Sequence, residues 1–347
     1  MSDSFVTDPV VRTRFCSFRL PRRAMELNLA LMAVMGGVLL CSLALGETRL
    51  APGEVWAALT GAGEVGHGLL VNAIRLPRSC AALTAGAALG LAGALLQTLT
   101  RNRLASPEVL GVNDGGLMAV MIVVLFLPSA SSALWMVSAG GAYLAFLLLM
   151  VFSRDIGAHG HRFLVIGIGL SQLLRAVNEL MLSAGQLQHV TAVYVWSVGS
   201  FVGRGYAEAL PVSAGVLFCL GWSWRLQRDI DLFSYGEATA AGVGVRTTSV
   251  KIQTVLLAAV SAGLGISVGG PLAFVALAAP VAYARLLGSP RLSLLGAALC
   301  GGGMTLTGDW VGRILLAPIE LPAGLVCRTL GGLFLLWLLV HPKGRGR

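Results

Sequence analysis

Apolar runs of about twenty residues recur along this chain, and they restrict its possible folds more than any other feature. A run of that length crosses the hydrocarbon core of a bilayer as a helix that rises about 1.5 Å per residue. The 347 residues are 56% hydrophobic and 12% charged, whereas soluble domains carry about 25% charged residues. The sequence therefore predicts an all-α polytopic membrane protein.

The apolar runs predict about ten transmembrane helices. They lie at residues 25–45, 79–99, 109–128, 133–152, 163–183, 209–224, 252–270, 272–284, 292–311 and 322–340. The run at 272–284 is too short to cross alone, so we expect it to begin inside the protein, where backbone is shielded from lipid. Residues 25–340 then form one transmembrane domain between an N-terminal tail, 1–24, and a C-terminal tail, 341–347. The basic tail before an apolar run also imitates a signal peptide, but the many later spans favour a retained first helix.

The distribution of positive charge predicts the orientation. Ten spans place both termini on one side, and 18 of the 25 Lys and Arg residues fall on that side. Cytoplasmic loops carry such an excess, so both termini are expected in the cytoplasm. Five lie on the opposite side, namely Arg49, Arg75, Arg78, Arg204 and Arg313. The net charge of +9 is spread over short loops and forms no basic stripe, which argues against nucleic-acid binding.

Several classes of site have no signal in the sequence. The six cysteines form no C-x-x-C pair, and the five histidines do not cluster as metal ligands. We therefore predict no metal site, no cofactor and no catalytic residues. The chain also lacks the G-x-x-x-x-G-K-[ST] phosphate-binding motif, so any ATP hydrolysis would require another subunit.

Two charged residues, Arg175 and Glu179, lie four positions apart inside the span at 163–183. Placing either charge alone near the bilayer centre costs about 3 kcal/mol, so we expect them to face each other or a water-filled path. A translocation path and a purely structural ion pair remain equally open. Small residues such as Gly86, Gly90 and Gly93 favour close helix packing over direct contact with a substrate.

Motifs spread from residue 75 to residue 340 resemble the permease subunits of bacterial ATP-driven importers for iron–siderophore complexes, haem and vitamin B12, the FecCD type. They are Arg75-Leu76-Pro77-Arg78, the helix from Gly86 to Gln97, the segment from Arg101 to Gly111, Gly236-Glu237-Ala238-Thr239-Ala240 with Gly244-Val245, Gly270-Pro271-Leu272-Ala273-Phe274-Val275, Pro280 to Arg285, and Leu321-Pro322-Ala323-Gly324. The resemblance implies the permease fold of type II importers.

The resemblance also implies partners in the bacterial inner membrane. Two permease subunits, identical or paralogous, would form the pore within membrane lipid. Two ATP-binding cassette subunits would dock at the cytoplasmic face, and a periplasmic or lipid-anchored binding protein would deliver the substrate outside for alternating access.

The resemblance assigns roles to individual residues. Arg75, Arg78 and Arg313 would bind carboxylates of the binding protein, although Asp309, one turn before Arg313, is an alternative local partner. The interval 225–251 would couple to the ATPase through two short helices, with Gly236, Glu237, Ala240 and Gly244 at the contact; an amphipathic loop on the membrane surface is the alternative. Gln97, Arg175 and Glu179 are candidates for the translocation path.

The chain departs from the family pattern at Arg103, Val281 and Leu333, which replace a proline, a histidine and a proline. Ala276-Leu277 and Gly331-Gly332 look more like the subunits for ferric catecholate siderophores such as enterobactin, so this substrate is favoured over vitamin B12 or haem. An ion-coupled secondary transporter and an intramembrane enzyme also stay open. Each lacks most of the buried carboxylates, or the nucleophile and base, that it would need.

Overall fold

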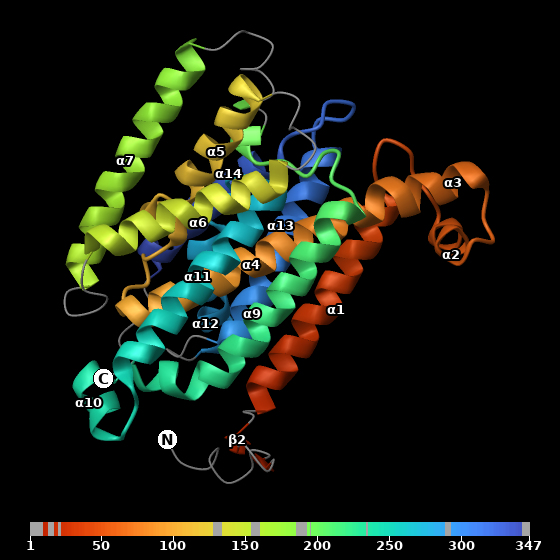
Figure 1. The fold of residues 1–347 in the computed structure, drawn as a ribbon. Helices are drawn as coiled ribbons and strands as arrows, with labels where there is room; N and C mark the ends of the chain where they lie inside the picture. The colour runs from red at the N-terminus through yellow and green to blue at the C-terminus, as the bar shows by residue number, and fades with distance from the viewer. Residues whose placement is uncertain are drawn as a thin grey trace.

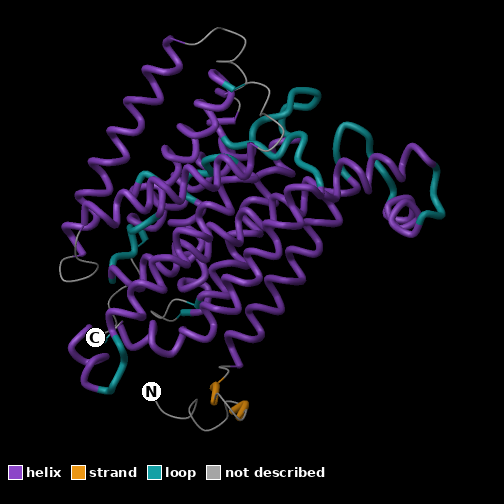
Figure 2. Tube along the Cα trace, viewed as in Figure 1, coloured by secondary structure: helices purple, strands orange, loops and turns teal. Residues whose placement is uncertain are grey.

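The structure is a computed structural model that describes residues 10–12, 17–19, 22–127, 134–153, 160–184, 193–194, 196–233, 235–288 and 293–341. Most of the two predicted tails therefore lies outside the described residues. Helices dominate the described part (Figure 2). The exceptions to helix and loop there are two short antiparallel strands, β1 (Val10–Arg12) and β2 (Ser17–Arg19), which pair Val10 with Arg19.

Ten main helices in the described residues correspond to the ten predicted spans. They are α1 (Arg22–Ala44), α4 (Leu76–Thr100), α5 (Val112–Phe126), α6 (Leu134–Ser153), α7 (Gly160–Ala184), α9 (Tyr206–Phe233), α11 (Thr247–Gly269), α12 (Val275–Leu287), α13 (Leu294–Ile314) and α14 (Ala323–Val340). By length and composition six helices of the described chain can cross a membrane, while α5, α12 and α14 are apolar but shorter. The structure is therefore an all-helical membrane bundle.

Helix α4 runs through the middle of the bundle (Figure 1). Its glycines allow the neighbouring backbones to approach. A Cβ built at Gly86, Gly90 or Gly93 would lie 2.2, 2.2 or 1.7 Å from a carbonyl oxygen of α13 or α12. Such distances exclude any side chain, so the close-packing interpretation of these glycines agrees with the structure.

The central helix begins well before the predicted residue 79. Helix α3 (Val65–Leu69) and the π-helical segment η1 (Leu70–Arg75) lead directly into α4. Pro77 lies just after η1, in the first turn of α4. Because proline lacks an N–H and clashes with the preceding turn, a wider π turn accommodates it without breaking the helix.

A helical arm occupies much of the interval 47–78, which the sequence presents as polar. It consists of α2 (Pro52–Thr60) and α3 and projects sideways from the bundle beyond α1 (Figure 1). The arm has a small core of its own, made of Leu43, Leu50, Val55, Ala58 and Val71. Asn72 Nδ2 also donates to the carbonyl of Ala58 at 2.8 Å. Helices of nine and five residues are too short to give a clear periodic signal.

Most of the predicted coupling interval, 225–251, is helical. Helix α9 continues to Phe233, and the short helix α10 (Glu237–Gly242) follows after Gly236, whose φ is 112°. The first of the two predicted short helices, expected at residues 232–235, is therefore wrong, because Leu232 and Phe233 belong to the last turn of α9. The apolar run ends near residue 224, but charged residues can continue a helix outside the membrane.

Helix α12 begins inside the bundle, as its short length predicts. Val275 and Ala276 are buried, and the preceding residue, Phe274, has a φ of 68°. The N–H of Phe274 donates to Glu108 Oε1 at 2.9 Å, from the 3-10 helix η2 (Pro107–Leu110). A side chain far away in the sequence thus satisfies one free N–H at the start of this helix.

Both ends of the described chain meet at one end of the bundle, which we call the terminal end. A Cβ at Gly288, after α12, would lie 3.5 Å from the guanidinium of Arg23 in α1. Arg285 of α12 donates to the carbonyl of His341, after α14, and lies over the ring of Trp337. The opposite end carries Arg75, Arg78 and Arg313, and we call it the arginine end.

Candidate functional site

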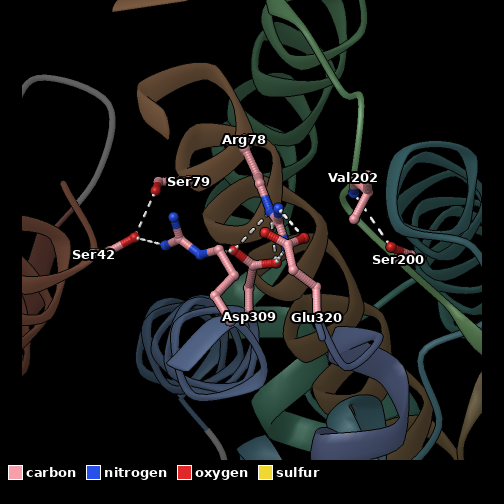
Figure 3. Close-up of polar contacts among 8 residues, drawn as sticks. Ser42, Arg78, Ser79, Ser200, Val202, Asp309 and Glu320 are labelled. Carbon is pink, nitrogen blue, oxygen red and sulfur yellow. Dashed lines mark hydrogen bonds and ion pairs between the residues drawn. The ribbon is translucent and has the colours of Figure 1, made fainter. Parts of the chain in front are cut away.

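A charged cluster joins α4, α13 and the segment before α14 at the arginine end (Figure 3). Arg78 Nε donates to both carboxylate oxygens of Asp309, at 3.0 and 3.1 Å, and Arg78 Nη2 lies 2.9 Å from Asp309 Oδ1. Arg78 Nη1 also donates to Glu320 Oε2 at 2.8 Å. The Asp309 side chain is 1% exposed, whereas the Glu320 side chain is 43% exposed. Arg78 therefore has one buried and one accessible carboxylate partner.

Arg313 extends the cluster toward α1. Its Nε lies 3.4 Å from Asp309 Oδ2, one helical turn earlier on α13, and its Nη2 donates to Ser42 Oγ. Ser42 in turn shares a hydrogen bond of 2.9 Å with Ser79, on α4 beside Arg78 (Figure 3). The cluster thus ties together the ends of α1, α4 and α13.

Arg75 binds backbone rather than carboxylates. Its Nη1 donates to the carbonyl of Leu43 and its Nη2 to the carbonyl of Thr48, both at 2.6 Å. Gly46 leaves room for this side chain, since a Cβ there would lie 2.8 Å from Arg75 Nη2. Arg75 therefore holds the loop after α1 against the start of α4.

The sequence predicts that the three arginines bind carboxylates of another protein, but in the structure each of them already has partners within this chain. Arg75, Arg78 and Arg313 are 4%, 6% and 6% exposed, and each is bound within the chain. The alternative partner proposed for Arg313, Asp309, does contact it. Glu320 was missed because it is a lone carboxylate in the mostly apolar segment after α13, where nothing in the sequence indicates a partner 242 residues away.

A fourth arginine, Arg204, lies in the segment before α9. Burial lowers the pKa of the Arg204 guanidinium, and the nearby carboxylate of Glu208 opposes this shift. Glu208 Oε2 accepts the N–H of Gly205 at 2.9 Å. Arg204 Nε has no hydrogen-bond partner among the described residues.

An ion pair holds the predicted coupling interval, 225–251, near the terminal end. Glu237 Oε1 of α10 pairs with Lys251 Nζ of α11. Lys251 is buried, although it lies near the N-terminus of α11, where the helix dipole disfavours a positive charge. Glu237 therefore compensates a buried cation and fixes α10 against α11.

The predicted contact residues of this segment differ in exposure. Ala240 is fully buried, so its small side chain serves packing within the chain and does not face a partner. Gly236 and Glu237 are half-buried, and Gly244, with a φ of 88°, is exposed. Ala241, which was not among the predicted residues, is exposed too. A shallow groove of about 620 Å³ adjoins them at the start of α11, lined in part by Val245, Arg246 and Gln253.

Helix α7 carries Arg175 and Glu179, which were expected to face each other or a water-filled path, and they do not pair with each other. Arg175 Nε lies 3.7 Å from Asp114 Oδ1, in the first turn of α5. Asp114 also accepts from Ser171 Oγ at 2.6 Å, and its carbonyl accepts from Asn178 at 3.0 Å. Glu179 is exposed and makes no ion pair with another described residue. Sequence spacing allowed an Arg175–Glu179 pair, but the packing of α5 on α7 provides a nearer carboxylate.

The third predicted path residue, Gln97, is 1% exposed. Its Nε2 donates to the carbonyl of Leu277 at 3.1 Å and so links α4 to α12. In this conformation Gln97 cannot line a path between subunits, because other helices of the same chain cover it.

The three departures from the family pattern lie in different surroundings. Arg103 is exposed in the turn after α4, close to Arg101, whose φ of 51° directs the chain there. Val281 is buried within α12, and Leu333 is exposed on α14. None of the three contacts the charged cluster at the arginine end.

Comparison with known proteins gives a consistent result. The FecCD transport family matches residues 32–341. The achromobactin transport system permease protein of Dickeya dadantii is 34% identical over 321 residues, 92% of each chain. The ferric enterobactin permease of Escherichia coli is 32% identical, covering 85% of this chain and 90% of that one. The vitamin B12 import permease of Vibrio cholerae is 33% identical, covering 86% and 89%.

A solved structure has the same fold. It is described as an inward-facing conformation of a metal-chelate type ABC transporter, with a TM-score of 0.80 and 22% sequence identity. The match covers 91% of this chain and 99% of that one. The likeness therefore extends over the whole helical bundle.

Proposed function

This chain belongs to the FecCD transport family, and from that premise we propose that it carries a ferric siderophore, with the catecholate type favoured, into the bacterial cell. The coarser function is established by the same match: the chain is a multi-pass permease subunit of an ABC importer of the iron–siderophore, haem and vitamin B12 class, without an ATPase site of its own. The observation that carries the proposal is the family match over nearly the whole bundle.

Support for the catecholate substrate comes from the enterobactin permease relative and from Ala276-Leu277 and Gly331-Gly332. The relatives for vitamin B12 and for hemin, at 33% and 31% identity, support the alternative substrates. An uptake assay decides between them. A deletion strain that expresses this chain with its partner subunits is given ⁵⁵Fe-labelled catecholate, hydroxamate and citrate complexes, cobalamin and haem. Uptake of the catecholate complex alone is expected, and uptake of cobalamin or haem alone would contradict the proposal.

A second permease, identical or paralogous, is proposed to pack along the α7 side. The Arg175 side chain is 57% exposed and Glu179 is exposed too. Charged side chains on a membrane helix face a partner or water rather than lipid. Between the two subunits, Arg175 and Glu179 would line the path of a bulky anionic complex.

The ATPase subunits are proposed to bind the terminal end, which would then face the cytoplasm together with both termini. The excess of positive charge on that side supports this orientation. The exposed surface of α10 and of the turn after it, including Ala241 and Gly244, would receive the ATPase together with the adjoining groove. The Glu237–Lys251 pair would pass its movement to α11.

The binding protein is proposed to dock at the arginine end. Because Arg75, Arg78 and Arg313 already have partners within the chain, docking through them requires that carboxylates of the binding protein compete with those partners. Glu320 is the most exposed of these partners, so a carboxylate of the binding protein would most easily replace Glu320 at Arg78. The three arginines outnumber Asp309 and Glu320 by one positive charge, which would attract an acidic surface.

A further inference from the structure

A shallow groove of about 700 Å³ lies between the helical arm and the loop after α1. Its wall includes Leu50, Leu69, Leu70 and Ile74, with Arg49 and His67 among the polar residues. The groove therefore combines an aliphatic wall with cationic or titratable groups.

The aliphatic wall stays exposed although the arm has filled its own core. Leu69 is 61% and Ile74 is 57% exposed, and Val65 and Trp56 of the same arm are 81% and 70% exposed. Val55, Ala58 and Val71 already form the inner side of the arm. Large apolar side chains gathered in this way indicate a contact surface rather than a free solvent face.

The arm lies on a side of the bundle that faces lipid. It extends from α1, and Figure 1 shows α1 and the arm at the edge of the bundle opposite to α7. Only 11% of the α1 span is buried within the chain, and its exposed residues include Leu29, Val34 and Leu40. A helix with such a surface faces lipid, whereas the exposed charges of α7 require water or protein. The groove is thus continuous with the lipid-facing side.

The charge at the groove specifies the kind of lipid. Arg49 is exposed and forms no ion pair with another described residue. His67 lies 3.9 Å from Glu64 Oε2, so the positive charge that distinguishes the groove is that of Arg49. A guanidinium beside an aliphatic groove at the membrane surface suits a phosphate headgroup, and one positive charge favours a lipid with net negative charge.

We propose that this groove binds an anionic phospholipid of the leaflet at the arginine end. The acyl chains contact Leu69 and Ile74, and the phosphate contacts Arg49. Trp56, on the same arm, then lies near the membrane interface, where tryptophan is enriched. The bound lipid would anchor the arm beside α1, independently of which substrate the importer carries.

Native mass spectrometry of the full chain in detergent tests the proposal. The delipidated protein is titrated with phosphatidylglycerol and with phosphatidylcholine of the same acyl chains. We expect one phosphatidylglycerol to be retained about fivefold more tightly than phosphatidylcholine, the factor of one arginine contact. Arg49→Gln should remove this preference, and Leu69→Asn should weaken retention of both lipids.

Arg103→Gln, an exposed arginine in the turn after α4, is the matched control and should leave retention unchanged. Arg49 and Leu69 are exposed, so their variants are expected to fold like the wild type, which a thermal unfolding curve verifies. Equal retention of the two lipids by the wild type would overturn the proposal. So would a loss of assembly with the partner subunits in Leu69→Asn without any change in lipid retention, because the groove would then be a protein contact.

Discussion

Arg78 and Asp309 lie 231 residues apart in the sequence, yet Arg78 Nε contacts both carboxylate oxygens, at 3.0 and 3.1 Å. The pair is almost fully buried and fixes the start of α4 to the last turns of α13. Since Asp309 also contacts Arg313, one carboxylate compensates two buried guanidinium groups. This arrangement makes the arginine end a structural joint as well as a proposed docking surface.

Asp309→Asn should strongly destabilise the chain. It leaves Arg78 and Arg313 without their shared buried carboxylate, and loss of one partner of a buried pair costs about 3 to 5 kcal/mol. Glu320→Gln removes an exposed partner and should cost no more than about 1 kcal/mol. Thermal unfolding of both variants in detergent measures the difference, and equal losses would show that Asp309 does not hold the joint.

Exchanging Arg75 and Arg78 for glutamate should prevent correct folding. The new side chain at position 78 would lie beside Asp309 and Glu320, so three carboxylates would meet where Arg313 is the one arginine left in the described cluster. A loss of docking in this double variant would therefore not show that Arg75 and Arg78 contact the binding protein, because the variant would also be misfolded. Size-exclusion profiles of the purified variant check the expectation, and a monodisperse, normally stable protein would contradict it.

Glu320→Gln should strengthen docking of the binding protein. The change frees Arg78 Nη1 for a partner's carboxylate and raises the positive charge at the arginine end by one. We expect a several-fold lower Kd for the importer's binding protein, with a larger effect at low salt. The matched control is Glu64→Gln, which removes an exposed carboxylate in the arm. An equal gain in affinity in both variants would show that net charge alone, and not the release of Arg78, causes the effect.

Breaking the Glu237–Lys251 pair should uncouple ATP hydrolysis from uptake. Lys251→Met leaves α10 without its ionic link to α11, so movement of the ATPase reaches α11 less completely. The ratio of substrate imported to ATP hydrolysed in proteoliposomes should fall. The exchanged pair Glu237→Lys with Lys251→Glu should restore part of the ratio, and no recovery would indicate that the two residues act separately.

Ala240 and Ala241 should respond differently to the same substitution. Ala240 is fully buried, so Ala240→Trp overfills the packing of α10 and should reduce the yield of folded protein. Ala241 is exposed, so Ala241→Trp should fold normally but bind the ATPase less well. Co-purification of the ATPase with each variant, relative to folded permease, distinguishes the two, and normal ATPase binding by Ala241→Trp would exclude this surface.

Arg175→Gln should impair uptake with little effect on stability. The side chain is largely exposed and 3.7 Å from Asp114, so its ion pair contributes little to folding, whereas a path for an anionic complex would lose a positive charge. Leu173→Ala, also exposed on α7, is the control. Normal uptake by Arg175→Gln in the strain described above would show that Arg175 does not line the translocation path.

The sequence by itself determined the number and order of the ten main helices, because a bilayer requires apolar runs of a minimum length whatever their neighbours are. It also indicated the close packing at Gly86, Gly90 and Gly93, since only small residues permit such contact. The short α12 followed from the same length argument. These features depend on local composition and can therefore be predicted without coordinates.

Only the tertiary structure decided which charges meet. Hydropathy gives the depth of a residue in the membrane but not the direction in which its side chain points or which helix lies beside it. For that reason Arg175 pairs with Asp114 rather than Glu179, Arg78 with Asp309 and Glu320, and Gln97 with the backbone of Leu277. The length of α9 beyond its apolar run and the arm beyond α1 were likewise decided by packing, because Ile230 and Phe233 of α9 are buried and the arm shares a small core with Leu43 of α1.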